Sequence, residues 1–121
     1  MKPYALMIHV EDPAAAVAWY GKAFPETKTE YLAEFDLHLL QMAGFSIEVV
    51  RADEKVGSGK KGTVLYWEVP NLAEEIERLE KLGASLYRGP MPIEDGLGMC
   101  QLADPFGNLL GLRGPFQPDA A

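Results

Sequence analysis

The chain repeats itself, and this internal repeat limits its possible folds more than any other feature of the 121 residues. Each copy begins with a short run of strand-forming residues, Tyr4 to Val10 and Thr63 to Val69, which leads directly into a helical pattern. At an offset of 59 residues the two copies stay in register, so that Asp12 corresponds to Asn71. The sequence therefore predicts two copies of one strand-helix unit.

Both predicted helices have signals at their ends. In the first copy Asp12 is a natural N-cap, and Pro25 ends a helix that we expect over residues 14–24. In the second copy Asn71 takes the N-cap position and Gly83 the C-terminal cap. The matching caps support the repeat independently of the apolar residues.

Each helix is followed by strand-like runs that end in a hairpin. These runs cover residues 36–42, 45–51, 98–103 and 109–113. With one more strand expected in each copy, the chain is predicted to be an α+β protein built of two βαβββ modules in a single domain, residues 1–121. Module one spans about residues 1–55 and module two about residues 62–116, with Asp53 to Lys61 as the linker. The segments Glu26–Glu34 and Pro90–Gly98 are expected to be loops.

Two segments resemble the vicinal-oxygen-chelate superfamily, which includes glyoxalases, bleomycin-resistance proteins and extradiol dioxygenases. The segment YALMIHVEDPAAAVAWYGKAF is similar to the first strand and helix of these proteins, and ADPFGNLLGL resembles the Asp-Pro-x-Gly-Asn turn before their last strand. The resemblance covers essentially the whole chain. It implies the glyoxalase/bleomycin resistance fold, in which the two modules form a curved mixed sheet around a central cavity that takes a small molecule.

Metal-dependent members of this superfamily hold a divalent ion with His, Glu or Gln side chains. The resemblance maps the four ligand positions onto Ala5, Glu48, Val64 and Gly111. Only Glu48 can coordinate a metal, and one carboxylate cannot replace a cage of three or four donors, so we expect no metal and no other cofactor. A rearranged metal site made of His9, Glu48 and Glu68 remains open as an alternative.

The alternation of side chains along the strands sorts the residues onto two faces. One face is apolar and is expected to pack under the helices, together with His38, for which a structural role is expected. The other face is expected to line the cavity and to bind the ligand. The ligand-binding residues predicted on it are Met7, His9, Glu48, Tyr66, Glu68, Gln101 and Arg113.

Glu48 is the candidate for a catalytic group, because a carboxylate between Ile47 and Val49 is costly to bury in mid-strand without a function. His9 and Glu68, near strand ends, could equally be exposed or hydrogen-bonded residues without a role in binding. The sequence contains no nucleophile motif, and the lone Cys100 is expected to be a small core residue.

Eighteen acidic against eleven basic residues give a formal charge of −7, which disfavours nucleic acids and anionic membranes as partners. The chain has no apolar run near the roughly 20 residues of a membrane span, no visible export signal and one cysteine, so we expect a cytoplasmic protein. Open sheet edges lead us to expect a homodimer.

Three functions are compatible with these features. The first is metal-independent binding or sequestration of a small organic ligand, with cationic ligands favoured by the acidity. The alternative is a glyoxalase I-like lyase or a related metal-dependent or dioxygenase-like enzyme. A third is an accessory domain that binds another protein.

Overall fold

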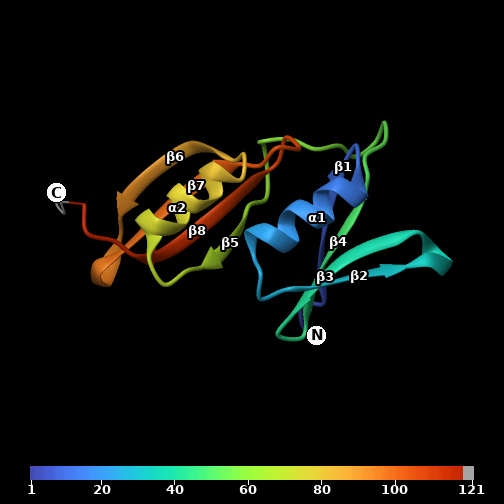
Figure 1. The fold of residues 1–121 in the computed structure, drawn as a ribbon, viewed down its shortest axis with the longest axis horizontal. Helices are drawn as coiled ribbons and strands as arrows, with labels where there is room; N and C mark the ends of the chain where they lie inside the picture. The colour runs from blue at the N-terminus through green and yellow to red at the C-terminus, as the bar shows by residue number, and fades with distance from the viewer. Residues whose placement is uncertain (119–121) are drawn as a thin grey trace. The chain divides into compact units, whose positions relative to one another are not determined.

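The computed structural model describes residues 1–118, which divide into two compact units (Figure 1). The first unit is Met1–Ser58, and the second begins at Gly59. Both units have the same order of elements, a strand, a helix and three more strands. The boundary lies inside the linker expected between the two modules.

The first unit is a four-stranded mixed sheet with one helix. Its elements are β1 (Ala5–Val10), α1 (Pro13–Ala23), β2 (Lys28–Leu32), β3 (Leu37–Met42) and β4 (Phe45–Arg51), with a 3-10 turn, η1 (Ala33–Phe35), between β2 and β3. The strand order is β1-β4-β3-β2, in which β1 and β4 are parallel and the other pairs antiparallel.

The second unit repeats this topology. Its elements are β5 (Leu65–Glu68), α2 (Leu72–Lys81), β6 (Ser85–Pro92), β7 (Leu97–Ala103) and β8 (Leu109–Pro115), with a 3-10 turn, η2 (Glu94–Gly96), between β6 and β7. The strand order is β5-β8-β7-β6, again with only the first pair parallel. The predicted α+β class and the two βαβββ modules are confirmed.

Both helices begin at the predicted caps. Asp12 Oδ1 accepts a hydrogen bond from the backbone N–H of Ala15, and Asn71 Oδ1 accepts one from Glu74, each at 3.1 Å. These bonds satisfy N–H groups that the first turn of a helix leaves without partners. No helix within residues 1–118 is long and apolar enough to cross a membrane.

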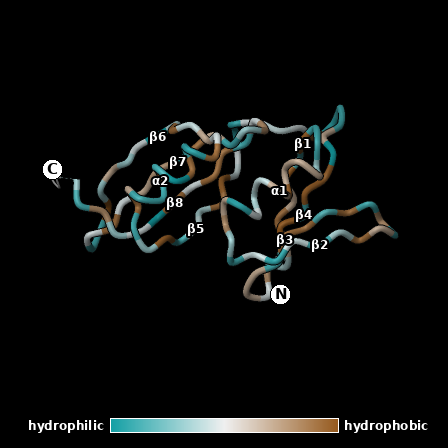
Figure 2. Tube along the Cα trace, viewed as in Figure 1, coloured by the Kyte–Doolittle hydropathy of each residue, from teal (hydrophilic) through white to brown (hydrophobic). Residues whose placement is uncertain are grey.

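Each unit has a core between its helix and one face of its sheet. In the first unit α1 contacts the sheet, whose residues Leu40, Ile47 and Val49 are almost completely buried. In the second unit Leu110 and Leu112 are buried in the same way on β8. Figure 2 shows hydrophobic stretches of the first unit along β3 and β4. The apolar face predicted from side-chain alternation is therefore the buried one.

The segments expected as loops are partly strands, so that expectation was wrong in part: Glu26–Glu34 contains β2, and Pro90–Gly98 contains the end of β6 and the start of β7. Residues 28–32 form β2, and residues 85–92 form β6, whose residues are all exposed. Neither strand has the apolar alternation that marks a half-buried strand, because each lies at the edge of its sheet and is held by pairing with one neighbour.

The Asp-Pro-x-Gly-Asn turn between β7 and β8 is closed by its own side chains. The buried Asp104 accepts hydrogen bonds through Oδ1 from the backbone N–H groups of Phe106 and Asn108, at 2.8 and 2.9 Å. Asn108 Oδ1 in turn accepts a hydrogen bond from the backbone N–H of Gly59 at 2.9 Å. The turn therefore also holds the start of the second unit.

The turn between β3 and β4 has two residues, as predicted, because Met42 pairs with Phe45. Both central residues have positive φ, 45° at Ala43 and 76° at Gly44. This geometry is unfavourable for alanine by roughly 1 kcal/mol, whereas asparagine tolerates it. We expect A43N to raise the free energy of unfolding by about 0.5–1 kcal/mol, measured by urea denaturation.

The matched control is A18N on the exposed side of α1, where alanine has no positive φ. There asparagine is the poorer helix former, so the same substitution should lower stability by about 0.5 kcal/mol. A loss of stability in A43N would contradict the assigned turn geometry.

Candidate functional site

The face of the first sheet that points away from α1, called the open face below, carries two rows of side chains across its strands. Because Ile47 and Val49 are buried toward α1, their neighbours Ser46 and Glu48 point to the open face. The strand register gives one row as Met7, Glu48, Leu39 and Glu30. It gives the other as Ala5, Ser46, Gln41 and Lys28.

Glu48 occupies the middle of the open face. It lies between Met7 on β1 and Leu39 on β3, so apolar side chains flank it on both neighbouring strands. It is partly buried, and within residues 1–118 no hydrogen bond or ion pair reaches its carboxylate. A carboxylate in this setting retains access to solvent but lacks a protein partner.

Met7 and His9 share the open face with Glu48. Met7 is 50% exposed, and His9 is partly buried beside Val50 of β4. His9 also interacts electrostatically with the carboxylate of Asp53, which the sequence analysis did not include in the site. The pKa of Asp53 is held below its usual range mainly by hydrogen bonds from the backbone N–H groups of Val56 and Lys55, with a smaller contribution from the charge of His9.

In the second unit the Tyr66 ring lies over Gly111. The two residues are partners in the register of β5 and β8, and a Cβ atom added at Gly111 would lie 2.5–2.6 Å from three carbons of the ring. Gln101 Nε2 donates a hydrogen bond to the Tyr66 hydroxyl at 2.8 Å. Glycine at position 111 is therefore what permits the ring to lie this close to β8.

Glu68 and Arg113 are neighbours on the same face of the second sheet as Tyr66. Arg113 forms an ion pair with Glu94 of η2, in which both side chains are largely exposed. The pKa of Glu94 lies below its usual value because of its own backbone N–H and then the Arg113 guanidinium. A ligand that uses Arg113 therefore has to compete with Glu94.

The predicted site residues thus form two groups. Met7, His9 and Glu48 share the open face of the first unit, whereas Tyr66, Glu68, Gln101 and Arg113 share one face of the second. The single cavity that would combine the two groups stays a prediction.

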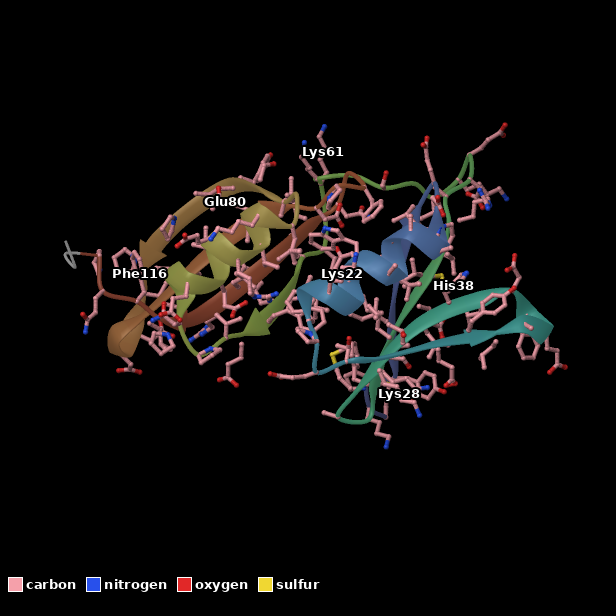
Figure 3. All side chains as sticks on the ribbon, viewed as in Figure 1. Lys22, Lys28, His38, Lys61, Glu80 and Phe116 are labelled. Atoms are coloured by element: carbon pink, nitrogen blue, oxygen red, sulfur yellow. The ribbon has the colours of Figure 1, made fainter. Side chains whose placement is uncertain are left out.

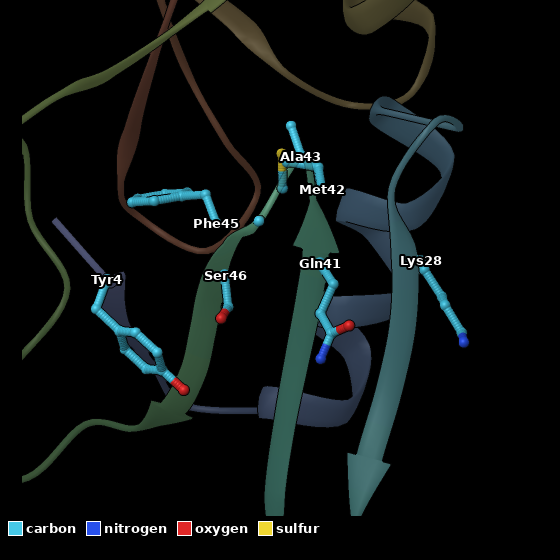
Figure 4. Close-up of a pocket in the computed structure, with 8 residues that line it drawn as sticks. Tyr4, Lys28, Gln41, Met42, Ala43, Phe45 and Ser46 are labelled. Atoms are coloured by element: carbon cyan, nitrogen blue, oxygen red, sulfur yellow. The ribbon is translucent and has the colours of Figure 1, made fainter. Parts of the chain in front are cut away.

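A hollow of about 450 Å³ lies at the turn end of the open face and was missed by the sequence analysis. It is lined by Tyr4, Lys28, Gln41, Met42, Ala43, Gly44, Phe45 and Ser46 (Figure 4). Lys28 could not be placed from sequence because β2 was taken for a loop. Side-chain alternation along β3 and β4 puts Gln41 and Ser46 on this face.

The residues at the superfamily's metal-ligand positions do not fit a divalent ion. Ala5 and Val64 have no donor atoms, and the space for a side chain at Gly111 is filled by the Tyr66 ring. Among residues 1–118, no three His, Cys, Asp or Glu side chains are grouped closely enough to hold a metal. Glu48 alone cannot supply the three or four protein ligands that such ions need.

Two further residues have structural roles, as predicted. Burial raises the pKa of the Cys100 thiol to about 11, so Cys100 is a core residue rather than a nucleophile. His38 (Figure 3) is on the α1 side of the sheet and packs on Tyr31, with ring centroids 4.5 Å apart. The hydroxyl of Tyr31 donates a hydrogen bond to Asp36, which raises the pKa of Tyr31.

Several solved structures share this fold. A glyoxalase/bleomycin resistance protein/dioxygenase family enzyme from Burkholderia phytofirmans is 19% identical, with a TM-score of 0.70 over 93% of this chain and 98% of its own. The fosfomycin resistance protein FosX from Listeria monocytogenes is 14% identical, with a TM-score of 0.76 over 96% of this chain and 94% of its own. A glyoxalase family protein from Bacillus cereus is 17% identical, with a TM-score of 0.74 over 97% and 95%.

These likenesses define a protein of the glyoxalase/bleomycin resistance fold class. The sequence model of the glyoxalase-like domain family matches residues 5–112, so the chain belongs to the glyoxalase-like domain family. A search among curated proteins found no significant match.

The contact between Tyr66 and Gly111 yields a stability prediction. G111A should lower the free energy of unfolding by about 1–3 kcal/mol, because the added methyl group overlaps the ring. In a Y66A background the same substitution should cost much less, so the double-mutant cycle should show clear coupling. Urea denaturation of the four proteins measures it.

G59A is the control, because nothing lies within 4 Å of a Cβ atom at Gly59 and its φ is not positive. It should change stability by less than about 0.5 kcal/mol. Additive costs of G111A and Y66A would show that the ring does not occupy the space above Gly111.

Proposed function

We propose that this glyoxalase-like domain binds a small organic ligand that carries a cationic group, and that Glu48 on the open face receives that group. The observation that carries the proposal is that, among residues 1–118, no hydrogen bond or ion pair reaches the Glu48 carboxylate between Met7 and Leu39. A charged group with apolar neighbours interacts more strongly with an opposite charge than it would in bulk water. A ligand ammonium or several N–H donors would supply the missing partner.

The charge of the protein supports the same ligand class. The formal net charge of −7 attracts cations, and Glu30 adds a second carboxylate to the row that contains Glu48. Similar folds occur in proteins named for resistance to fosfomycin and to bleomycin, which are both small molecules. Sequestration of such a compound needs only binding, and it requires no metal.

The remaining predicted residues are proposed as ligand contacts, each within its own unit. Met7 and His9 would flank the ligand beside Glu48 on the first sheet, and Tyr66, Glu68, Gln101 and Arg113 form a second proposed group on one face of the second sheet. In this role Tyr66 and Gln101 are already oriented by their mutual hydrogen bond. Glu48, the proposed catalytic group if any reaction occurs, would act as a general base.

The proposal is tested by thermal-shift and calorimetric titration with bleomycin as a cationic probe and fosfomycin as an anionic one, each with and without added zinc or nickel. We expect stabilisation by bleomycin without metal. E48Q keeps the shape of the side chain and removes its charge, so it should weaken binding by about 1–3 kcal/mol, or roughly five- to 150-fold in Kd.

E34Q is the control, because Glu34 is an exposed carboxylate in η1, outside the strands of the open face. It should bind bleomycin as wild type does. Equal binding by E48Q and wild type would refute the role of Glu48. About one zinc or nickel per chain retained after dialysis, with ligand binding only in its presence, would favour the glyoxalase I-like lyase instead.

We also propose that the protein forms a homodimer. Each sheet of residues 1–118 has two outer strands, β1 and β2 in the first unit and β5 and β6 in the second. Exposed strand edges favour pairing with another chain or shielding by one. Light scattering at micromolar concentration should give twice the chain mass of 13.3 kDa, and the mass of one chain would contradict this proposal.

A further inference from the structure

We infer that the ligand of the open face is a zwitterion, whose cationic group lies at Glu48 and whose carboxylate or other anionic group lies in the hollow beside Lys28. This inference rests on the proposed function and extends it by naming a second charged group on the ligand. It depends on β2, which adds a lysine to a face on which the sequence analysis named Met7, His9 and Glu48.

The open face separates its charges into two rows. The row through Glu48 also contains Glu30, and both residues are hydrogen-bond acceptors only. The adjacent row contains Ser46, Gln41 and Lys28, which offer a hydroxyl, an amide and an ammonium as donors. A molecule lying along β4 therefore meets acceptors at one end and donors at the other.

The donor row forms part of the wall of the hollow. In Figure 4 Ser46, Gln41 and Lys28 follow one another across β4, β3 and β2, with Tyr4 beside Ser46. The hollow has a volume of about 450 Å³, which is within the usual range for a small-molecule site. Its remaining lining includes Tyr4, whose ring can contact the apolar part of a ligand.

Lys28 is available to a ligand. It is exposed, and within residues 1–118 its ammonium makes no ion pair, although Glu30 is only two residues away on the same strand. Glu30 instead accepts a hydrogen bond from Gln41 Nε2 at 3.3 Å. Within the described part of the chain, the Glu48 carboxylate and the Lys28 ammonium are thus both without an ion-pair partner on a single face.

The geometry of a β-sheet sets the distance between the two ligand charges. Residues i and i+2 of one strand are about 6.6 Å apart, and each step to a neighbouring strand adds about 4.8 Å. Glu48 and Ser46 are therefore separated by roughly 7 Å, and Glu48 and Lys28 by roughly 12 Å between Cα atoms. A ligand with charges about 7–12 Å apart can reach both, whereas a free α-amino group and its own carboxylate are too close together.

The test uses three probes of equal carbon chain length, titrated into ¹⁵N-labelled protein and followed by NMR. They are ε-aminocaproate, which is a zwitterion, its methyl ester, which is only cationic, and caproate, which is only anionic. We expect ε-aminocaproate to bind about three-fold more tightly than the ester, with amide shifts at Ser46 and at the Gln41 side chain. Caproate should bind more weakly than either amine.

Two variants separate the inference from the proposed function. K28M should make ε-aminocaproate and its ester bind equally, with the affinity of the ester unchanged. E48Q should weaken both amines. K22M is the control, because Lys22 is on α1, which covers the other face of the sheet, and it should leave all three affinities as in wild type.

Equal binding of the zwitterion and its ester to wild type, or an unchanged ratio in K28M, would overturn the inference and leave the role of Glu48 intact. Insensitivity of both amines to E48Q would instead overturn the proposed function. Absence of binding by ε-aminocaproate at tens of millimolar would overturn the zwitterion inference, and bleomycin binding would still report on Glu48 independently.

Discussion

The parallel pairing of the first strand of each unit with its last strand is the constraint on which the rest of the structure depends. With the last strand beside the first, the second strand of each unit lies at the opposite edge of the sheet and runs in the same direction as the first. A tight turn cannot make this connection, so α1 and α2 cross over one face of the sheet and bury it. The opposite face is left without a helix. The same pairing places Met7 beside Glu48 and Tyr66 beside Gly111, so the functional chemistry follows from the backbone register.

The two units share this register but differ in the chemistry it supports. In the first unit the position on the last strand holds a carboxylate, and its neighbour on the first strand is a flexible methionine. In the second unit the equivalent pair is a glycine under an aromatic ring, fixed further by Gln101. One unit therefore presents an unpaired charge, and the other presents a rigid, internally hydrogen-bonded surface.

Local signals in the sequence were sufficient for the repeat, both N-caps, the Ala43-Gly44 turn and the assignment of faces. These features depend on neighbouring residues and on the period of the strand, which a one-residue slip would disrupt. One more strand was expected in each module, but the positions of β2 and β6 were not found, because pairing with one neighbour stabilises these strands without an apolar face. Lys28 and the hollow were not found because the position of β2 was not found. The Asp95-Gly96 pair marks the turn that carries Glu94, but no local pattern gives its contact with Arg113.

The Tyr66 ring above Gly111 also limits how this domain can change over evolutionary time. A side chain able to bind a metal cannot be introduced at position 111 while the ring is there, because even a Cβ atom would overlap it. A smaller residue at position 66 has to come first, and that step removes the hydroxyl that accepts from Gln101 before any metal ligand is gained. The order of substitutions is thus restricted, because position 66 has to change before position 111 can gain a metal-binding side chain.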